Sequence, residues 1–150
     1  MTPELLAAWR ATEYRFVAGD RLLVMRVGQP QPDVDALLAA HDSAGLAFIS
    51  NFNPRGERYP DKANGQRSEA LQNWLLRRGL LYWLGLGVPA ADSDWAPETS
   101  FAVVGLSRED AQRVAEECEQ RGFVWHPRGE CTELVVLDSP RVQPTAPAPR

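Results

Sequence analysis

The chain contains few of the residues that build metal and disulfide sites. Its 150 residues include two cysteines, Cys118 and Cys131, and two histidines, His41 and His126. The cysteines are too few and too far apart for a disulfide framework or a zinc site, and neither histidine has a Cys or His partner at metal-ligand spacing. The sequence therefore predicts no metal site and two reduced cysteines.

Long apolar runs and a basic leader are also absent. No segment approaches the roughly 20 apolar residues that a membrane-spanning helix requires, and the N-terminus lacks the basic start of a signal peptide. The net charge of -4 argues against non-specific binding of nucleic acid, which needs a basic surface. We therefore expect a cytoplasmic protein that does not enter a membrane.

Familiar catalytic motifs are missing as well. The chain has no Gly-x-Ser-x-Gly nucleophile elbow, no apparent Ser-His-Asp or Cys-His arrangement, and no glycine-rich phosphate-binding loop. The sequence thus identifies no reaction and no cofactor.

What is present is the composition of one ordinary globular domain. Hydrophobic residues make up 44% of the chain and charged residues 24%, and the length suffices for a real core. We expect a single domain over residues 1–137. Residues 138–150 contain four prolines, which predicts a disordered tail.

Hydrophobic periodicity and turn residues give an order of elements. Helices are expected at 3–10, 32–44, 61–78 and 107–121, and strands at 13–17, 22–27, 46–50, 80–84, 100–104, 123–126 and 132–137. The order α-β-β-α-β-α-β-β-α-β-β predicts an α/β (α+β) sandwich, in which a mixed sheet carries packed helices. The nearly continuous apolar character of 22–27 favours a central strand.

The segment Ser50-Asn51-Phe52-Asn53-Pro54 is the most informative part of the chain. It directly follows a buried strand, and in open α/β sheets ligands bind where strands end. Asn51 and Asn53 offer donors and acceptors that suit a base edge, an amide or a sugar. The two amides could equally satisfy the backbone of the turn itself.

A second candidate group lies at the start of the helix expected over 61–78. Asn64 and Arg67 fall on the same helix face as Leu71, and an arginine near a helix N-terminus forms a ready anion site. Residues 51–78 also carry six Lys or Arg against three acids. The alternative is that Arg67 reaches solvent while Asn64 caps a neighbouring loop.

Glu98 stands at a strand entrance between Trp95 and Ser100. A carboxylate beside apolar rings can have a raised pKa and act as an acid or a base. A structural salt bridge to Arg26 or Arg67 is the alternative for this carboxylate.

The same residues carry a resemblance to a known family. They are Arg26-Val27-Gly28-Gln29-Pro30, Ser50–Pro54, Asn64, Trp95-x-x-Glu98-x-Ser100 and Gln120. Over about residues 10–137 the chain resembles the small bacterial proteins of the domain-of-unknown-function family 3293, although Ser50-Asn51 stands where a Thr-Ala-like pair is expected. The family has no established activity, so the resemblance supports the fold and the choice of polar residues and implies no substrate.

We therefore expect a small-ligand-binding protein with a polar pocket for an anionic or nucleotide-like molecule. The predicted pocket residues are Gln29, Ser50, Asn51, Asn53, Asn64, Arg67, Glu98 and Ser100. Two alternatives stay open. One is an adaptor that binds a protein partner, with a purely structural polar motif, and the other is a hydrolase or transferase that uses Glu98 as general base.

Overall fold

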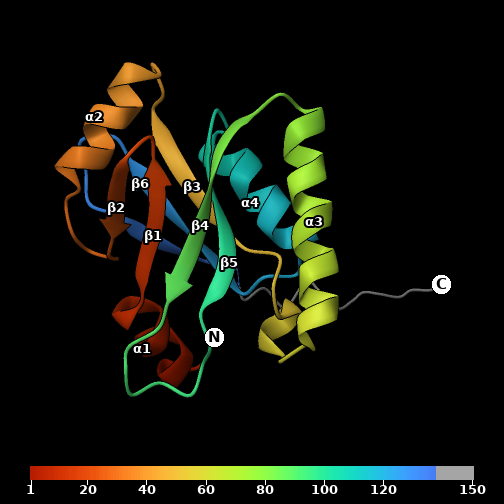
Figure 1. The fold of residues 1–150 in the computed structure, drawn as a ribbon. Coiled ribbons are helices and arrows are strands. Elements are labelled where there is room, and N and C mark those ends of the chain that lie inside the picture. The colour runs from red at the N-terminus through yellow and green to blue at the C-terminus, as the bar shows by residue number, and fades with distance from the viewer. Residues whose placement is uncertain (138–150) are drawn as a thin grey trace.

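Seven antiparallel strands form one curled sheet in the computed structural model, which describes residues 1–137 (Figure 1). The tail predicted at 138–150 lies outside the described residues. The strands are β1 (Glu13–Ala18), β2 (Arg21–Met25), β3 (Gly45–Ile49), β4 (Leu81–Val88), β5 (Glu98–Val104), β6 (Gly122–Pro127) and β7 (Glu133–Val136). Their order across the sheet is β2-β1-β4-β5-β3-β6-β7.

The predicted α/β (α+β) class and the predicted order of elements are confirmed, but the sheet is antiparallel rather than mixed. The reason lies in the helical connections. The strands β3 and β4 run in the same direction but are separated by β5, and β5 and β6 are likewise separated by β3. These two crossovers, through α3 and α4, therefore each skip one place in the sheet, and an antiparallel strand fills that place.

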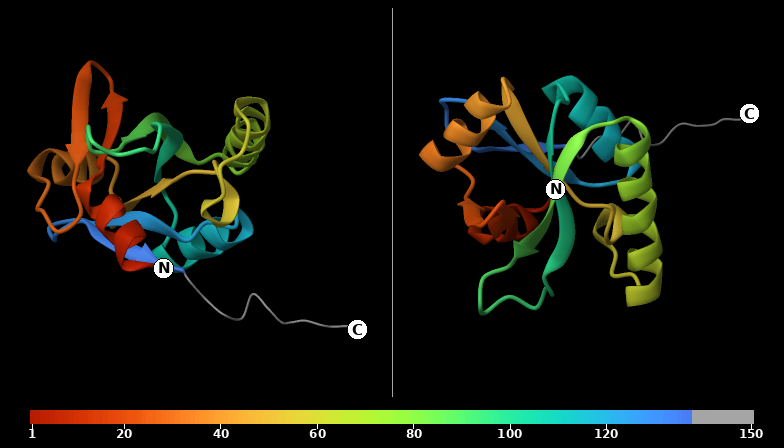
Figure 2. Two further views of the ribbon diagram at one scale, coloured as in Figure 1. Left: turned by 90° about the horizontal axis from the view of Figure 1, so that it is seen from below. Right: turned by 45° about the horizontal axis from the view of Figure 1, so that its top comes forward.

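Helices cover both faces of the sheet (Figure 2). They are α1 (Pro3–Ala11), α2 (Pro32–Ala40), α3 (Asp61–Arg77) and α4 (Arg108–Glu117), with a short 3-10 turn, η1, at Pro54–Gly56. The helices α3 and α4 pack on one face and α2 on the other. Strand β3 is buried on both faces. Ala47 and Ile49 pack in the hydrophobic core beneath α3 and α4, while Leu46 and Phe48 pack in the core beneath α2.

Two predicted helix starts are confirmed by their caps. The hydroxyl of Ser107 accepts a hydrogen bond from the Asp110 backbone N–H at 3.0 Å, and that of Thr2 accepts one from Leu5 at 3.1 Å. The helix predicted over 32–44 ends earlier, at Ala40. Gly45 begins β3, where a Cβ atom would lie 2.3 Å from the Trp125 ring.

Two strand predictions also need correction. The strand β2 lies at the edge of the sheet, not at its centre, and Leu22 on it is 59% exposed. The strand β4 runs on to Val88, four residues beyond its predicted end, because its second half pairs with both β1 and β5. The loop 89–97 therefore begins at the lower end of the sheet, beside α1 (Figure 1).

None of the helices within residues 1–137 is long and apolar enough to cross a membrane.

Candidate functional site

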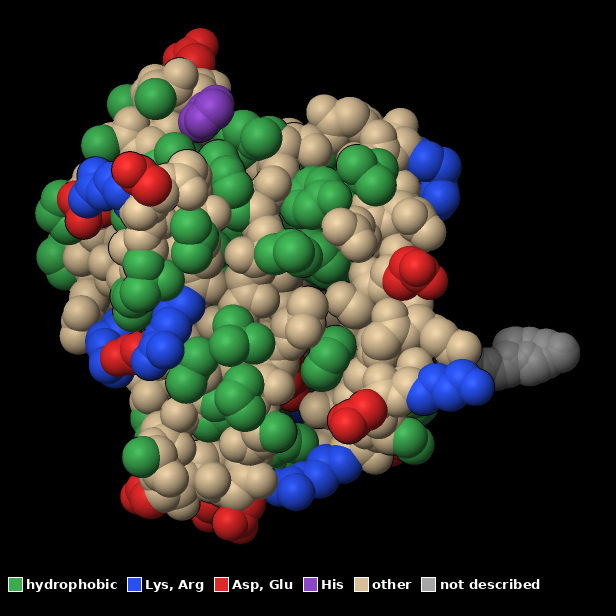
Figure 3. Space-filling model, in the orientation of Figure 1, with side chains coloured by type: hydrophobic (Ala, Val, Ile, Leu, Met, Phe, Trp, Pro, Cys, Tyr) green, Lys and Arg blue, Asp and Glu red, His purple; other side chains and the backbone are tan. Residues whose placement is uncertain are grey.

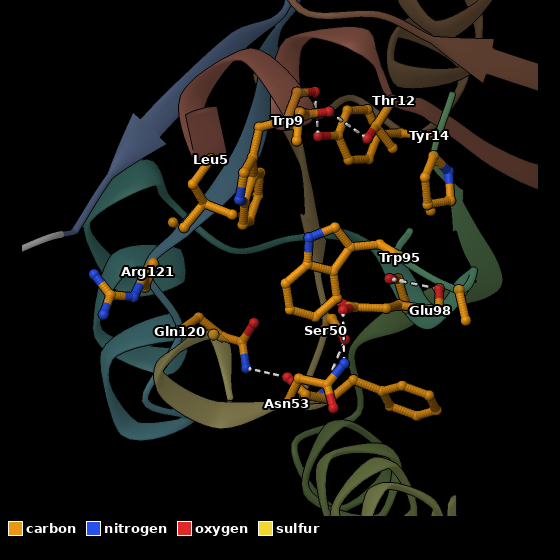
Figure 4. A pocket seen from close by; sticks show the side chains of 18 of the residues that line it. Leu5, Trp9, Thr12, Tyr14, Ser50, Asn53, Trp95, Glu98, Gln120 and Arg121 are labelled. Carbon is orange, nitrogen blue, oxygen red and sulfur yellow. Dashed lines mark hydrogen bonds between the residues drawn. The ribbon is translucent and has the colours of Figure 1, made fainter. Parts of the chain in front are cut away.

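A pocket of about 110 Å³ lies between α1, the loop 89–97, the end of β3 and the chain that follows α4 (Figure 4). Figure 3 shows a hollow in the lower half of one face of the molecule, bordered by hydrophobic side chains. The pocket forms there because β3 ends at Ile49 and β5 begins at Glu98 in neighbouring antiparallel strands, with Ile49 opposite Phe101. The chain on either side of this pair therefore meets at one end of the sheet.

Aromatic side chains form much of the pocket wall. Trp9 comes from α1, Tyr14 and Phe48 from the sheet, Phe52 from the loop after β3, and Trp95 from the loop 89–97. The Tyr14 ring meets the Phe48 ring edge-on at 5.4 Å between centroids, and its hydroxyl donates to the Trp9 carbonyl at 2.7 Å. None of these residues was predicted as pocket lining from the sequence; Tyr14 and Phe48 were missed because alternating aromatics on strands usually belong to the core.

Glu98 is the acidic side chain of the pocket wall. The Asn53 Nδ2 group donates to Glu98 Oε2 at 3.0 Å, and the Ser50 hydroxyl also hydrogen-bonds the carboxylate. Burial raises the pKa of Glu98, and the hydrogen bonds from Asn53 and Ser50 offset part of that rise. Glu98 is therefore easier to protonate than an exposed glutamate.

No basic residue of the described chain pairs with Glu98. Arg26 forms its salt bridge with Glu13 instead, and the nearest acidic oxygen to Arg67 belongs to Glu119, at 4.0 Å. The salt bridge considered for Glu98 from the sequence is thus not formed within residues 1–137.

Asn53 and Asn64 hold each other in place beside the pocket. The Asn53 backbone N–H donates to Asn64 Oδ1 at 2.8 Å, and Asn64 Nδ2 donates to Asn53 Oδ1 at 2.9 Å. Asn53 Oδ1 also accepts from the Tyr59 backbone N–H at 2.9 Å. Asn53 itself adopts a left-handed backbone with φ 48°. The amide of Asn64 therefore orients Asn53, whose Nδ2 is turned to Glu98.

Arg67 and Asn51 lie behind the pocket wall and do not line it. The guanidinium of Arg67 donates to the Asn51 carbonyl at 2.8 Å, to Asn51 Oδ1 at 2.7 Å and to the Cys118 carbonyl at 2.7 Å. Asn51 Nδ2 donates in return to the Arg67 carbonyl at 2.6 Å. The contacts join the segment after β3 to α3 and to the end of α4, which is a structural use of both side chains.

The structure brings together four of the eight predicted site residues at the pocket: Ser50, Asn53, Glu98 and Ser100. The Ser100 hydroxyl donates to the Glu98 carbonyl at 3.3 Å. Gln29 lies elsewhere, in the turn after β2, where its carbonyl accepts from the Thr132 N–H at 3.0 Å.

Gln120 and Arg121 complete the polar part of the pocket. Gln120 Nε2 donates to the Phe52 carbonyl at 2.9 Å and to the Cys118 carbonyl at 3.3 Å. Arg121 Nε donates to the Arg55 carbonyl at 2.9 Å, and Figure 4 shows its guanidinium directed away from Glu98. Gln120 figured in the sequence only through the family resemblance.

Within residues 1–137 no group of three His, Cys, Asp or Glu side chains could hold a metal ion. His126, which is fully buried, is tied instead to Thr132 Oγ1 at 2.8 Å and to Asp35 Oδ1 at 2.7 Å. Both cysteines are free thiols.

The comparisons with known proteins bear on the middle of the chain. The searches of curated proteins and of solved structures gave no match. The sequence model of a family described as "Protein of unknown function (DUF3293)" matches residues 49–122, which include Ser50, Asn53, Glu98 and Gln120. Over this segment the chain resembles the DUF3293 family of proteins of unknown function.

Proposed function

We propose that the protein binds a small molecule in this pocket, with Glu98 as the polar anchor. One observation carries the proposal: Glu98 is a partly buried carboxylate on a pocket wall, held by Asn53 and Ser50, with no basic partner in residues 1–137. Burying a charge without a countercharge costs free energy. Aromatic walls with a few convergent polar groups, one of perturbed pKa, are typical of ligand sites.

The anionic or nucleotide-like ligand expected from the sequence remains a prediction, and its main support has changed. That expectation depended on Arg67 facing the ligand, whereas the donors of Arg67 are used on Asn51 and Cys118. The charge beside the pocket centre is that of Glu98, which repels an anion when it is ionised.

The raised pKa of Glu98 favours a second candidate function, a hydrolase or transferase in which Glu98 is the general base. A carboxylate with a raised pKa holds an abstracted proton more readily than an ordinary glutamate does. In Glu98→Gln the side chain keeps its shape but cannot take a proton. Lost turnover with retained binding would therefore favour the enzyme.

The adaptor remains a third proposal. The adaptor hypothesis predicts a purely structural polar motif, and the contacts of Asn51 with Arg67 and of Asn53 with Asn64 fit that prediction. The adaptor hypothesis does not explain why Glu98 lies on a pocket wall, so we favour ligand binding over it.

A blocked pocket tests the binding proposal. Ala96 is an exposed residue of the pocket lining, so Ala96→Phe adds bulk there without removing core contacts. Ala7→Phe is the matched control, because Ala7 is exposed on α1 and does not line the pocket. A library of small metabolites is screened by NMR, with the indole N–H signals of Trp9 and Trp95 as reporters.

We expect binders to shift these two signals in the wild type and in Ala7→Phe but not in Ala96→Phe. If no compound moves either signal, or if binders act equally on Ala96→Phe, the pocket is not a binding site.

The cytoplasmic location and the bacterial origin are also proposals, and fractionation of cells that make the native protein would test the location.

A further inference from the structure

We infer that the ligand of this pocket is a small organic cation with a planar, hydrogen-bonding nitrogen group such as an amidinium or guanidinium, bound at Glu98. The inference depends on the proposed binding function and adds the chemical class of the ligand. It follows from the charge of the pocket, from the direction of its free hydrogen-bonding groups, from its aromatic walls and from its size.

The first argument concerns charge. An ionised carboxylate has about four acceptor sites on its two oxygens. Asn53 and Ser50 supply hydrogen-bond donors but no positive charge, so Glu98 keeps acceptor capacity and an unbalanced negative charge. A forked cationic donor satisfies both needs at once, because charge-assisted bonds to a carboxylate are about twice as strong as neutral ones.

The second argument concerns the other polar groups around the pocket. The Nδ2 donor of Asn53 is directed to Glu98, and the Ser50 hydroxyl lies between the Thr99 carbonyl, at 3.0 Å, and Glu98. Gln120 uses its Nε2 on backbone carbonyls, which leaves its Oε1 without a donor from residues 1–137. The acceptors left for a ligand on Glu98 and Gln120 therefore favour a ligand that carries hydrogen-bond donors.

The third argument comes from the aromatic walls. Aromatic ring faces attract cations, and tryptophan does so most strongly. Trp95 shows this property within the protein, since the guanidinium carbon of Arg58 lies 4.4 Å from its ring centroid. Arg58 does not line the pocket, whereas Trp95 and Trp9 do. The basic side chain of the lining, Arg121, directs its guanidinium away from Glu98 (Figure 4).

The size of the pocket limits the ligand. Its volume of about 110 Å³ is below the roughly 300 Å³ of drug-sized sites. It is closer to the roughly 150 Å³ cavity that holds one benzene ring. The ligand part inside the pocket is thus one ring or a short chain that ends in the cationic group.

Three compounds of one shape and different charge test the inference: benzamidine, benzamide and benzoate. Their binding is measured by titration calorimetry at neutral pH to the wild type, to Glu98→Gln and to Glu13→Gln. Glu13 is the control because it pairs with Arg15 and Arg26 and does not line the pocket. Glu98→Asp, which keeps the charge, is the second variant, and thermal melting confirms that each variant is folded.

We expect the wild type to bind benzamidine more tightly than benzamide, and benzamide more tightly than benzoate. Glu98→Gln should weaken benzamidine at least tenfold, equivalent to about 1.4 kcal/mol, and leave benzamide nearly unchanged. Glu13→Gln should change neither affinity, and Glu98→Asp should keep the order of the three compounds.

Two results would overturn the inference while leaving pocket binding intact. They are tightest binding of benzoate and an affinity for benzamidine that does not depend on residue 98. If none of the three compounds binds at millimolar concentration, the cation is refuted, and the screen with Ala96→Phe decides separately whether the pocket binds anything else.

Discussion

Replacing Arg67 by alanine distinguishes a structural arginine from a ligand-binding one. The guanidinium donates three hydrogen bonds, two to Asn51 and one to the Cys118 carbonyl, which lies 51 residues along the chain. In Arg67→Ala these acceptors lose their donors in a largely enclosed region, since the Arg67 side chain is only 25% exposed. A ligand-binding Arg67 outside the core would behave in the opposite way, with a stable fold and lost binding.

The expected loss of stability follows from these contacts. A hydrogen bond to a charged group contributes roughly 1.5–3 kcal/mol, and an unsatisfied buried acceptor costs about 1–3 kcal/mol. The three bonds share one side chain and are not additive, and water can reach part of the vacated space. We therefore expect Arg67→Ala to lower the free energy of unfolding by roughly 2–4 kcal/mol, near the upper end of typical point mutations.

Urea unfolding followed by tryptophan fluorescence measures this loss. The matched control is Arg113→Ala, because Arg113 is 68% exposed and its salt bridge with Asp110 lies on the surface of α4. The control should cost less than about 1 kcal/mol. If Arg67→Ala costs no more than Arg113→Ala, then the contacts of Arg67 with Asn51 and Cys118 do not hold the fold together, and the reasoning fails.

Four further predictions use the same measurement. Ser107→Ala should cost roughly 0.5–2 kcal/mol, because it removes the N-cap of α4. Gly45→Ala should cost about 1–3 kcal/mol by overpacking against Trp125. Asp35 has a lowered pKa, so its ionised form stabilises the fold above the ordinary value of 3.8, and this stabilisation is lost at lower pH. Asp35→Asn should therefore lower the free energy of unfolding at neutral pH and lower it progressively less in acid. Glu98 has a raised pKa, so its carboxyl is harder to ionise in the folded state, and this lowers the stability of the fold as the pH rises above 4.5. Glu98→Gln should therefore be more stable than the wild type at neutral pH, with no gain below pH 4.5.

Local patterns predicted the elements of this fold well. The caps at Thr2 and Ser107 depend on residues only a few positions apart. The position of a strand in the sheet depends instead on pairing between distant segments. The run 22–27 therefore has the composition of a central strand, yet β2 pairs only with β1 at the edge.

The pocket could be predicted only in part, for the same physical reason. Ser50 and Asn53 follow the end of β3, where the rule about strand ends predicted a site. Glu98 and Ser100 lie at the start of the neighbouring strand β5, where the sequence predicted a carboxylate beside Trp95. The partners of Arg67 are not encoded in the spacing along α3, because one of them is a backbone carbonyl at the end of α4. A basic side chain near a helix N-terminus has the same sequence signature whether it binds a ligand or a carbonyl.

The negative charge of Glu98 does not contribute to the stability of the fold. A glutamine at this position would accept the same hydrogen bond from Asn53 at no cost for a buried charge. The burial that raises the pKa of Glu98 also strengthens its attraction for a cation, because water screens the carboxylate less. A carboxylate here lowers folding stability at neutral pH. The proposed ligand cation would restore that stability by binding only the folded state.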